Sequence, residues 1–264
     1  MTRGVRLTPH RIWRCSVVVR PMEFSLIREI VPDSRGTWIN KIFVTIDIEW
    51  SCDDVLCDTI DLAEEAGIPV SWFVTHETKV LERLRSNPLF ELGIHPNFNP
   101  LLEGEKTTGG SAGEVVDRLM QVVPEAVSVR SHSLTSSSRL QEVFRSAGLT
   151  HEVNALVPET SGVRPPDPFL GWNGMTEVAY SNCDYVRCLS RSHKPVEELI
   201  VPGGASVFSF HPVHLFLNTV EISDYESTRP FHCDAGILMD HRHKTGVGNR
   251  SVFEDLARYA RDLA

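Results

Sequence analysis

Two acidic side chains stand one residue apart in the segment VTIDIEW, where Asp47 and Glu49 follow an apolar run. If that run is a β-strand, its period of two places both carboxylates on the same face. Two close carboxylates repel each other, and the pKa of one of them rises unless a cation lies between them. A metal ion, with one carboxylate as its ligand and the other as a base, accounts for the pair. The alternative is a strand end with solvated acids.

Histidines and an arginine occur in other segments that could act with this pair. His95 opens HPNFNP, in which two prolines restrict the backbone and Asn99 offers a carbonyl oxygen. Arg130 and His132 stand one residue apart in RSHS. A guanidinium can hold a carboxylate through two hydrogen bonds, and imidazole is the commonest ligand of zinc-like metals. The alternatives are a surface ion pair at Arg130 and a polar loop residue at His95.

His211 and His214 follow another apolar run, SVFSF. Because an imidazole titrates near neutral pH, His211 suits proton delivery to a leaving group. The alternative is a histidine that packs in the core with its hydrogen bonds satisfied.

Strands and helices that alternate along the chain would position these side chains. The apolar pattern predicts such alternation from residue 41 onward. The pattern predicts strands at 42–48, 69–75, 90–94, 126–130, 149–154 and 206–210. It predicts helices at 54–66, 77–85, 114–123, 136–146 and 252–263. Such alternation is typical of βαβ units with a parallel sheet, whose active sites lie at the carboxyl ends of the strands. A glycine-rich loop is expected at 104–113, a less regular stretch at 155–200, and a long polar stretch before the last helix.

Length and composition limit the class of protein. The chain has 264 residues, 41% of them hydrophobic, and a formal net charge of −9. These values exclude a disordered or fibrous chain and fit one α/β barrel of roughly 200–250 residues. No apolar run approaches the roughly 20 residues that span a bilayer, and the acidic balance argues against nucleic-acid binding. We therefore expect an enzyme or a ligand-binding domain.

The N-terminal segment and the cysteines bear on location and domain limits. Residues 1–22 hold five arginines and no acid, which fits a tail or, alternatively, a transit peptide. We expect residues 1–40 to be a basic extension and lead-in, and residues 41–264 to form a single domain. The six cysteines include no Cys-x-x-Cys pair and indicate free thiols in a reducing cytoplasm.

Five segments resemble, in the correct order, the motifs of the polysaccharide deacetylases, the NodB-homology group also called carbohydrate esterase family 4. These segments are VTIDIEW, EEAGIPVSWFV, ELGIHPNFNP, VRSHSL and VFSFHPVH, and they lie within residues 41–215. The likeness is greatest to the branch found among proteins of lipopolysaccharide O-antigen biosynthesis. It implies a distorted (β/α) barrel of seven parallel strands and a divalent transition metal: zinc, with cobalt or nickel as alternatives. It also implies the removal of acetyl groups from N-acetylated sugars.

Carried over residue by residue, the resemblance implies a base, a metal site and a general acid. Asp47 would be the base, and Glu49 and His95 would be metal ligands. Arg130 would orient Asp47, and His211 would be the general acid. The usual Asp-Asp pair is replaced here by Asp-x-Glu, so the roles of Asp47 and Glu49 could be exchanged.

Other departures from the family pattern concern the second metal-ligating histidine and the partner of the acid. Asn99 stands where that histidine is usual, and either Asn99 or His132 would complete the metal site. Asp184 is a candidate for the acid that tunes His211. The candidate substrate-binding residues are Asp184 itself, His76 and His214, of which the two histidines have no standard counterpart.

Two other functions stay open. The replacement of a histidine by Asn99 fits a glycan-binding barrel without catalysis, and the same site could hydrolyse an O-acetyl ester or another amide. The expected partner is an N-acetylated sugar or polysaccharide precursor.

Overall fold

A computed structural model describes residues 22–104, 110–244 and 246–262 of the chain. The arginine-rich segment lies outside these residues apart from Met22, and so do residues 105–109 of the expected glycine-rich loop. Across the described ranges, no helix is both long enough and apolar enough to cross a membrane.

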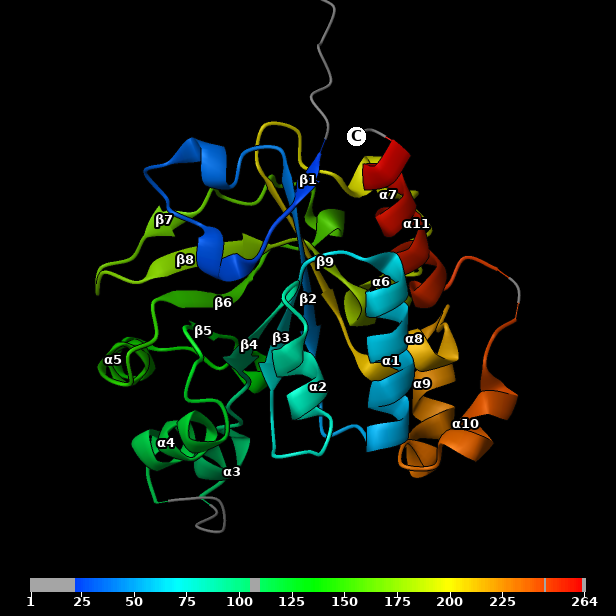
Figure 1. The fold of residues 1–264 in the computed structure, drawn as a ribbon, viewed down its shortest axis with the longest axis horizontal. Helices are drawn as coiled ribbons and strands as arrows, with labels where there is room; N and C mark the ends of the chain where they lie inside the picture. Colours follow the sequence, from blue (N-terminus) through cyan, green and yellow to red (C-terminus); the bar gives the residue numbers. More distant parts are fainter. Residues whose placement is uncertain (1–21, 105–109, 245, 263–264) are drawn as a thin grey trace, which may run out of the picture.

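Seven parallel strands form the body of the sheet and confirm the predicted fold class (Figure 1). Their spatial order is β8-β6-β5-β4-β3-β2-β10, and each neighbouring pair is parallel. The strands are β2 (Lys41–Asp47), β3 (Val70–Val74), β4 (Phe90–Ile94), β5 (Ser128–Val129), β6 (His151–Leu156), β8 (Thr176–Tyr180) and β10 (Ala205–Phe210). The sheet curls into a half-barrel, so that β8 and β10 come into contact.

Short strands extend the sheet at its margins. β1 (Glu23–Phe24) pairs in parallel with β2, and β9 (Asn182–Cys183) pairs in parallel with β10. β7 (Phe169–Leu170) pairs antiparallel with β8 and forms one edge. Because β1 joins the sheet and Met22 is buried, the described lead-in packs as part of the fold.

The alternation of side chains along β2 separates two cores. Ile42, Val44 and Ile46 pack in the larger cluster, between the sheet and the helices. Phe43 points to the other face and packs in the barrel interior. Both faces are buried, which explains why this strand is a nearly continuous apolar run. The polar side chain at the end of the strand, Asp47, is 3% exposed.

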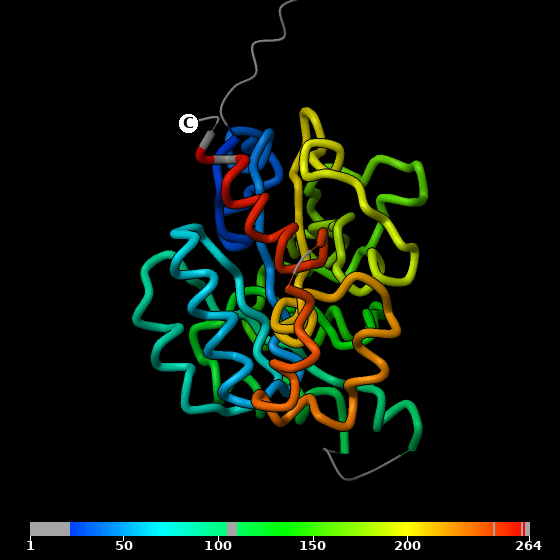
Figure 2. The backbone as a smooth tube through the Cα atoms, turned by 90° about the vertical axis from the view of Figure 1, so that its right-hand side faces the viewer, coloured from blue at the N-terminus to red at the C-terminus, as the bar shows by residue number. Residues whose placement is uncertain are grey.

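Helices follow most of the strands. The first, α1 (Asp53–Ala66), buries an apolar stripe and ends at Gly67, whose φ of 64° supplies the left-handed turn of a helix C-terminus. In Figures 1 and 2, the end of the last helix lies close to the lead-in that carries β1. The remaining helices are α2 (Leu81–Ser86), α3 (Asn99–Leu102), α4 (Ala112–Val122), α5 (Ser138–Ser146), α6 (Asp184–Ser190), α7 (Val196–Leu199), α8 (Pro212–Leu217), α9 (Ile222–Thr228), α10 (Ala235–His241) and α11 (Asn249–Asp262).

The sequence pattern missed several short elements. The helix predicted at 77–85 begins only at Leu81: residues 79–80 form a turn, and the Thr78 hydroxyl before this turn donates to the Asp53 carboxylate. The irregular stretch 155–200 contains β7, β8, β9, α6 and α7, and the polar stretch contains α9 and α10. A two-residue strand is too short to show a period, and α10 buries only Leu238.

Gly93 in β4 lies directly against Ser128 of the neighbouring strand β5, and a side chain at this position would clash. A Cβ at this position would lie 2.5 Å from Ser128 Oγ and 2.7 Å from the Ser128 carbonyl oxygen. We expect Gly93→Ala to lower the free energy of unfolding by about 1–3 kcal/mol through overpacking, measured as the shift in the urea unfolding midpoint. Gly36→Ala is the control, since no heavy atom lies within 4 Å of its Cβ position. Equal midpoints for the two variants would contradict the close packing of β4 on β5.

Candidate active site

A cavity of about 530 Å³ opens at the carboxyl ends of the strands. The residues after β2, β4, β5 and β10 converge there, as expected for a parallel α/β fold. Of the residues singled out from the sequence, it is lined by Asp47, Glu49, His95, Arg130, His132, His211 and His214.

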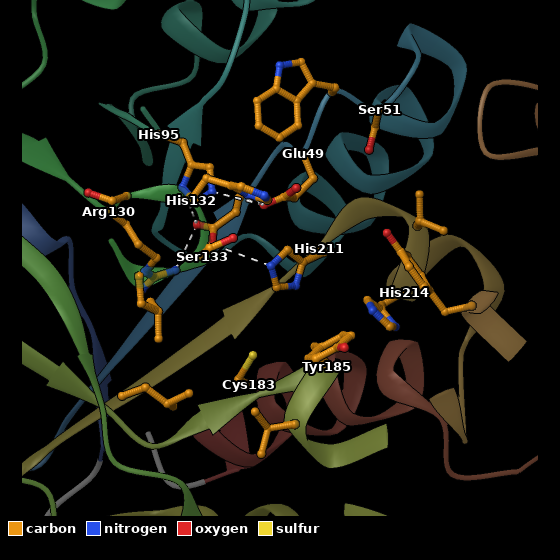
Figure 3. A pocket seen from close by; sticks show the side chains of 18 of the residues that line it. Glu49, Ser51, His95, Arg130, His132, Ser133, Cys183, Tyr185, His211 and His214 are labelled. Carbon is orange, nitrogen blue, oxygen red and sulfur yellow. Dashed lines mark hydrogen bonds and ion pairs between the residues drawn. The ribbon is translucent and has the colours of Figure 1, made fainter. Parts of the chain in front are cut away.

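Glu49, His95 and His132 form one cluster on the cavity wall. Glu49 Oε1 lies 3.0 Å from His95 Nε2 and 2.9 Å from His132 Nδ1. Figure 3 shows both imidazoles turned toward the glutamate. All three offer a ligand atom within 4.8 Å of the others. Two imidazole nitrogens and one carboxylate oxygen are a donor set that suits zinc, cobalt or nickel, so these residues fit a transition metal.

The charge of Glu49 is stabilised within this cluster. Burial alone would raise the pKa of the carboxyl group. Hydrogen bonds to His132 and His95 outweigh burial and hold the pKa of Glu49 well below its usual range. Glu49 is therefore an anion at neutral pH, the form in which a carboxylate binds a metal.

The backbone reaches this cluster through left-handed turns rather than through strand alternation. β2 ends at Asp47, and Glu49 and Trp50 have φ of 45° and 51°. The expectation that Asp47 and Glu49 share a strand face is therefore wrong, although both reach the cavity. Ser133 and Leu134, with φ of 55° and 56°, make a similar turn directly after His132. Such conformations cost on the order of 1–3 kcal/mol each and persist only where surrounding contacts hold them.

Asp47 is fixed from inside the barrel by Arg130. Asp47 Oδ1 accepts a hydrogen bond of 2.9 Å from Arg130 Nη1. The guanidinium is 1% exposed and also donates to the carbonyl oxygen of Val153 at 3.1 Å. It lies between two aromatic rings, with its central carbon 4.7 Å from the centre of Phe73 and 4.4 Å from that of Tyr180. The orientation of Asp47 is therefore set by an arginine that has little freedom to move.

The second oxygen of Asp47 faces His211. Asp47 Oδ2 lies 3.6 Å from His211 Nε2, and His211 Nδ1 lies 2.6 Å from Asp184 Oδ1. Asp184 also accepts a 2.6 Å hydrogen bond from the backbone N–H of His211. Burial alone would lower the pKa of His211, but the charge and hydrogen bond of Asp184, aided by Asp47 and Glu49, raise it to about 9. The imidazolium form is therefore favoured at neutral pH.

The other predicted site residues take different positions. His214 lines the cavity beside His211, with its Nδ1 2.8 Å from Thr219 Oγ1. Asp184 is fully buried behind His211 and does not line the cavity. The structure does not bring His76 or Asn99 to the cavity wall. The ring of His76 bonds to Thr75. Asn99 is the first residue of α3, and its side-chain amide donates to Ser133 Oγ.

Aromatic residues on the cavity wall were not singled out from the sequence. Trp50 is 41% exposed and packs edge-on against His132, and Tyr185 is 42% exposed. Tyr225 comes from α9 and His232 from the turn that follows, within the long polar stretch expected before the last helix. Only Trp50 carried a usable signal, because it directly follows the acidic pair in the sequence.

Comparisons with known proteins agree with this arrangement. Residues 44–229 match the family model described as WbmS-like polysaccharide deacetylase. A crystal structure from Bordetella bronchiseptica, WbmS, described as a candidate polysaccharide deacetylase involved in O-antigen biosynthesis, is similar to this chain with a TM-score of 0.83. The two share 38% identity over 89% of this chain and 97% of that one.

A more distant structure from Mycobacterium smegmatis, also described as a candidate polysaccharide deacetylase, shares 14% identity. The similarity covers 84% of this chain and 90% of that one, with a TM-score of 0.42. A comparison with curated proteins found no match. The family model spans most of the chain and the WbmS structure covers nearly all of it, and so this chain belongs to the WbmS-like polysaccharide deacetylase family.

Proposed function

We propose that this protein is a metal-dependent hydrolase that removes the N-acetyl group from an amino sugar or a polysaccharide precursor. The observation that carries the proposal is one cavity that joins a metal-type donor cluster to a carboxylate and an imidazolium. Asp47 lies between them, 3.9 Å from His95 Nδ1 on one side and 3.6 Å from His211 Nε2 on the other. Metal-assisted amide hydrolysis with a separate general base and general acid needs these three groups within reach of one carbonyl.

Glu49, His95 and His132 would hold the metal ion. When bound, a divalent transition metal supplies a Lewis acid that polarises the acyl oxygen and makes a water molecule nucleophilic at neutral pH. The imidazole of His132 supports a catalytic site rather than a glycan-binding barrel without catalysis, because it supplies the second histidine ligand that Asn99 does not supply.

Asp47 and His211 would move the protons. Arg130 occupies one oxygen of Asp47, so the other oxygen is the one that accepts a proton from the attacking water. His211 then donates its Nε2 proton to the amine nitrogen as the C–N bond breaks, because an unprotonated amide nitrogen is too poor a leaving group. The raised pKa of His211, about 9, supports this role, since it keeps the acid protonated before the reaction.

The similarity to WbmS supports a place in O-antigen or lipopolysaccharide biosynthesis, with an N-acetylated sugar precursor as the substrate. Cytoplasmic residence is part of this proposal. It is supported by the free cysteines of the described chain, two of which, Cys183 and Cys188, are buried.

The first prediction concerns metal binding. We expect wild-type protein equilibrated with zinc to hold about one equivalent, and His132→Ala to bind it at least about 10- to 100-fold more weakly, because one ligand is lost. Elemental analysis and competition with a chelator would measure this. His193→Ala, at an exposed histidine outside the cavity, is the matched control. Asn99→Ala should also keep the metal; loss in Asn99→Ala but not in His132→Ala would reverse the assignment.

The second prediction concerns turnover. With an N-acetylglucosamine oligosaccharide as substrate, we expect Asp47→Asn to lower kcat for acetate release by about 10²- to 10⁴-fold, the range of general base catalysis, while zinc is retained. Full activity in Asp47→Asn would contradict its role. Faster release from O-acetylated sugars would identify an esterase, and sugar binding without turnover by zinc-loaded wild-type protein would identify a glycan-binding barrel.

The third prediction concerns the Asp184–His211 pair. In metal-free protein we expect the pKa of His211, about 9 in the wild type, to fall in Asp184→Asn, because burial is then opposed only by the charges of Asp47 and Glu49. The protonated form would thus be lost at a lower pH. Histidine ring signals followed by NMR across pH 5–10 would measure the shift. An unchanged pKa would show that Asp184 does not tune His211.

A further inference from the structure

His214 lines the cavity but takes no part in the hydrolytic steps above. It lies one helical turn after His211, at the start of α8, and only 2% of its surface is exposed. Its ring stacks on Tyr225, with centres 4.6 Å apart and planes 11° apart. Figure 3 shows it beside His211, whose ring centre is 5.9 Å away. The plane of the ring is therefore fixed.

A buried hydrogen-bond network holds one nitrogen of this ring. His214 Nδ1 lies 2.8 Å from Thr219 Oγ1. The same oxygen lies 2.9 Å from Asn249 Nδ2 and 3.5 Å from Cys188 Sγ. The amide of Asn249 is oriented by a further contact, since its Nδ2 lies 3.3 Å from the carbonyl oxygen of Asp184, which can only accept.

The hydrogen bonds of this network set the tautomer of His214. The Thr219 hydroxyl has two lone pairs and one proton. Asn249 Nδ2 donates to one lone pair at 2.9 Å and also lies 3.2 Å from Cys188 Sγ. Burial raises the pKa of Cys188 to about 11, so the thiol keeps its proton. The hydroxyl proton then goes to the nearest and strongest acceptor, His214 Nδ1 at 2.8 Å, because Cys188 Sγ and the His214 carbonyl oxygen each lie 3.5 Å away and sulfur accepts only weakly. Nδ1 accepts, so the ring proton lies on Nε2.

The ring also stays neutral. Burial lowers the pKa of His214 to about 4, the opposite of the shift at His211. Among the described residues, no carboxylate forms a hydrogen bond with its nitrogens. In the described part of the chain, Nε2 has no hydrogen-bond partner. Nε2–H is thus a fixed donor on the wall of the cavity.

We propose that His214 is a substrate-binding residue whose Nε2–H donates a hydrogen bond to a neutral oxygen of the sugar next to the acetamido group. The oxygen is a hydroxyl or the carbonyl of a second acylated amine. A sugar with a free ammonium group at this position would be rejected, because the ammonium has only hydrogen-bond donors and would face the Nε2–H donor of His214. This inference rests on the proposed function and narrows its substrate to sugars with an acceptor at that position.

The tautomer is tested by NMR on the full-length zinc-loaded protein with ¹⁵N-labelled histidine. His214→Gln identifies the His214 signals by their loss. We expect the Nε2–H tautomer of a neutral ring from pH 6 to pH 8, and a shift toward the other tautomer in Thr219→Val. The Nδ1–H tautomer or a charged ring in the wild type would overturn the inference.

Sugar contact is tested in the zinc-loaded Asp47→Asn variant, which should bind without turnover. We expect an N-acetylglucosamine oligosaccharide to move the His214 Nε2 signal. His151 is the control, because it begins β6, at the end of the strand away from the cavity, and bonds to the Ile30 carbonyl oxygen. Its signal should not move. Binding of the sugar without movement of the His214 signal would overturn the inference while leaving the proposed function intact.

Kinetics separate recognition from catalysis. His214→Phe keeps the ring stacking but lacks the donor, and we expect it to raise KM for the same oligosaccharide about 3- to 10-fold with little change in kcat. His214→Gln restores a donor and should recover part of the affinity. An unchanged KM in His214→Phe would overturn the role of His214, whereas a wild-type enzyme that neither binds nor deacetylates the sugar would count against the proposed function.

Discussion

The buried ion pair between Arg130 and Asp47 is the contact on which the site depends. Arg130 bonds to Asp47 on β2, to Val153 on β6 and to Ser209 on β10, and it packs between rings from β3 and β8. One side chain thus joins strands on all sides of the barrel interior. Burying two charges is unfavourable unless they are paired with each other, and leaving one of them alone costs about 3–5 kcal/mol. The pair therefore couples the position of the carboxylate to the closure of the sheet.

Two histidines one helical turn apart are driven to opposite protonation states by their partners. The ring of His211 faces the carboxylates of Asp184 and Asp47, and these charges overcome the effect of burial and raise its pKa to about 9. The ring of His214 faces the hydroxyl of Thr219, which offers no charge, and burial prevails to give a pKa of about 4. A single short segment, HPVH, thus places a cation and a neutral donor side by side.

The sequence predicted the parts of the site that follow long buried strands. β2, β4 and β10 have clear apolar runs, and these runs alone were enough to place Asp47, His95 and His211 at the carboxyl ends of strands. The partners of these residues depend on contacts between distant segments. The roles of Thr219 and Asn249 arise only when α11 packs beside α8, and no local pattern marks either residue. Glu49 was expected to reach the site through strand alternation, but a left-handed turn brings it to the cavity instead.

Asn99 stands where the family motif usually has a second metal-ligating histidine, yet the donor cluster of Glu49, His95 and His132 still has two imidazoles. Asn99 does not line the cavity; its side-chain amide donates a 3.1 Å hydrogen bond to Ser133 Oγ. Ser133 lies in the left-handed turn directly after His132, so this bond fixes the segment that carries the imidazole. The backbone N–H of His132 is also bonded to the carbonyl oxygen of Pro96, which ties the same two loops together. The His95 loop thus contributes one imidazole directly and, through Asn99, helps to hold the second in place from the neighbouring strand.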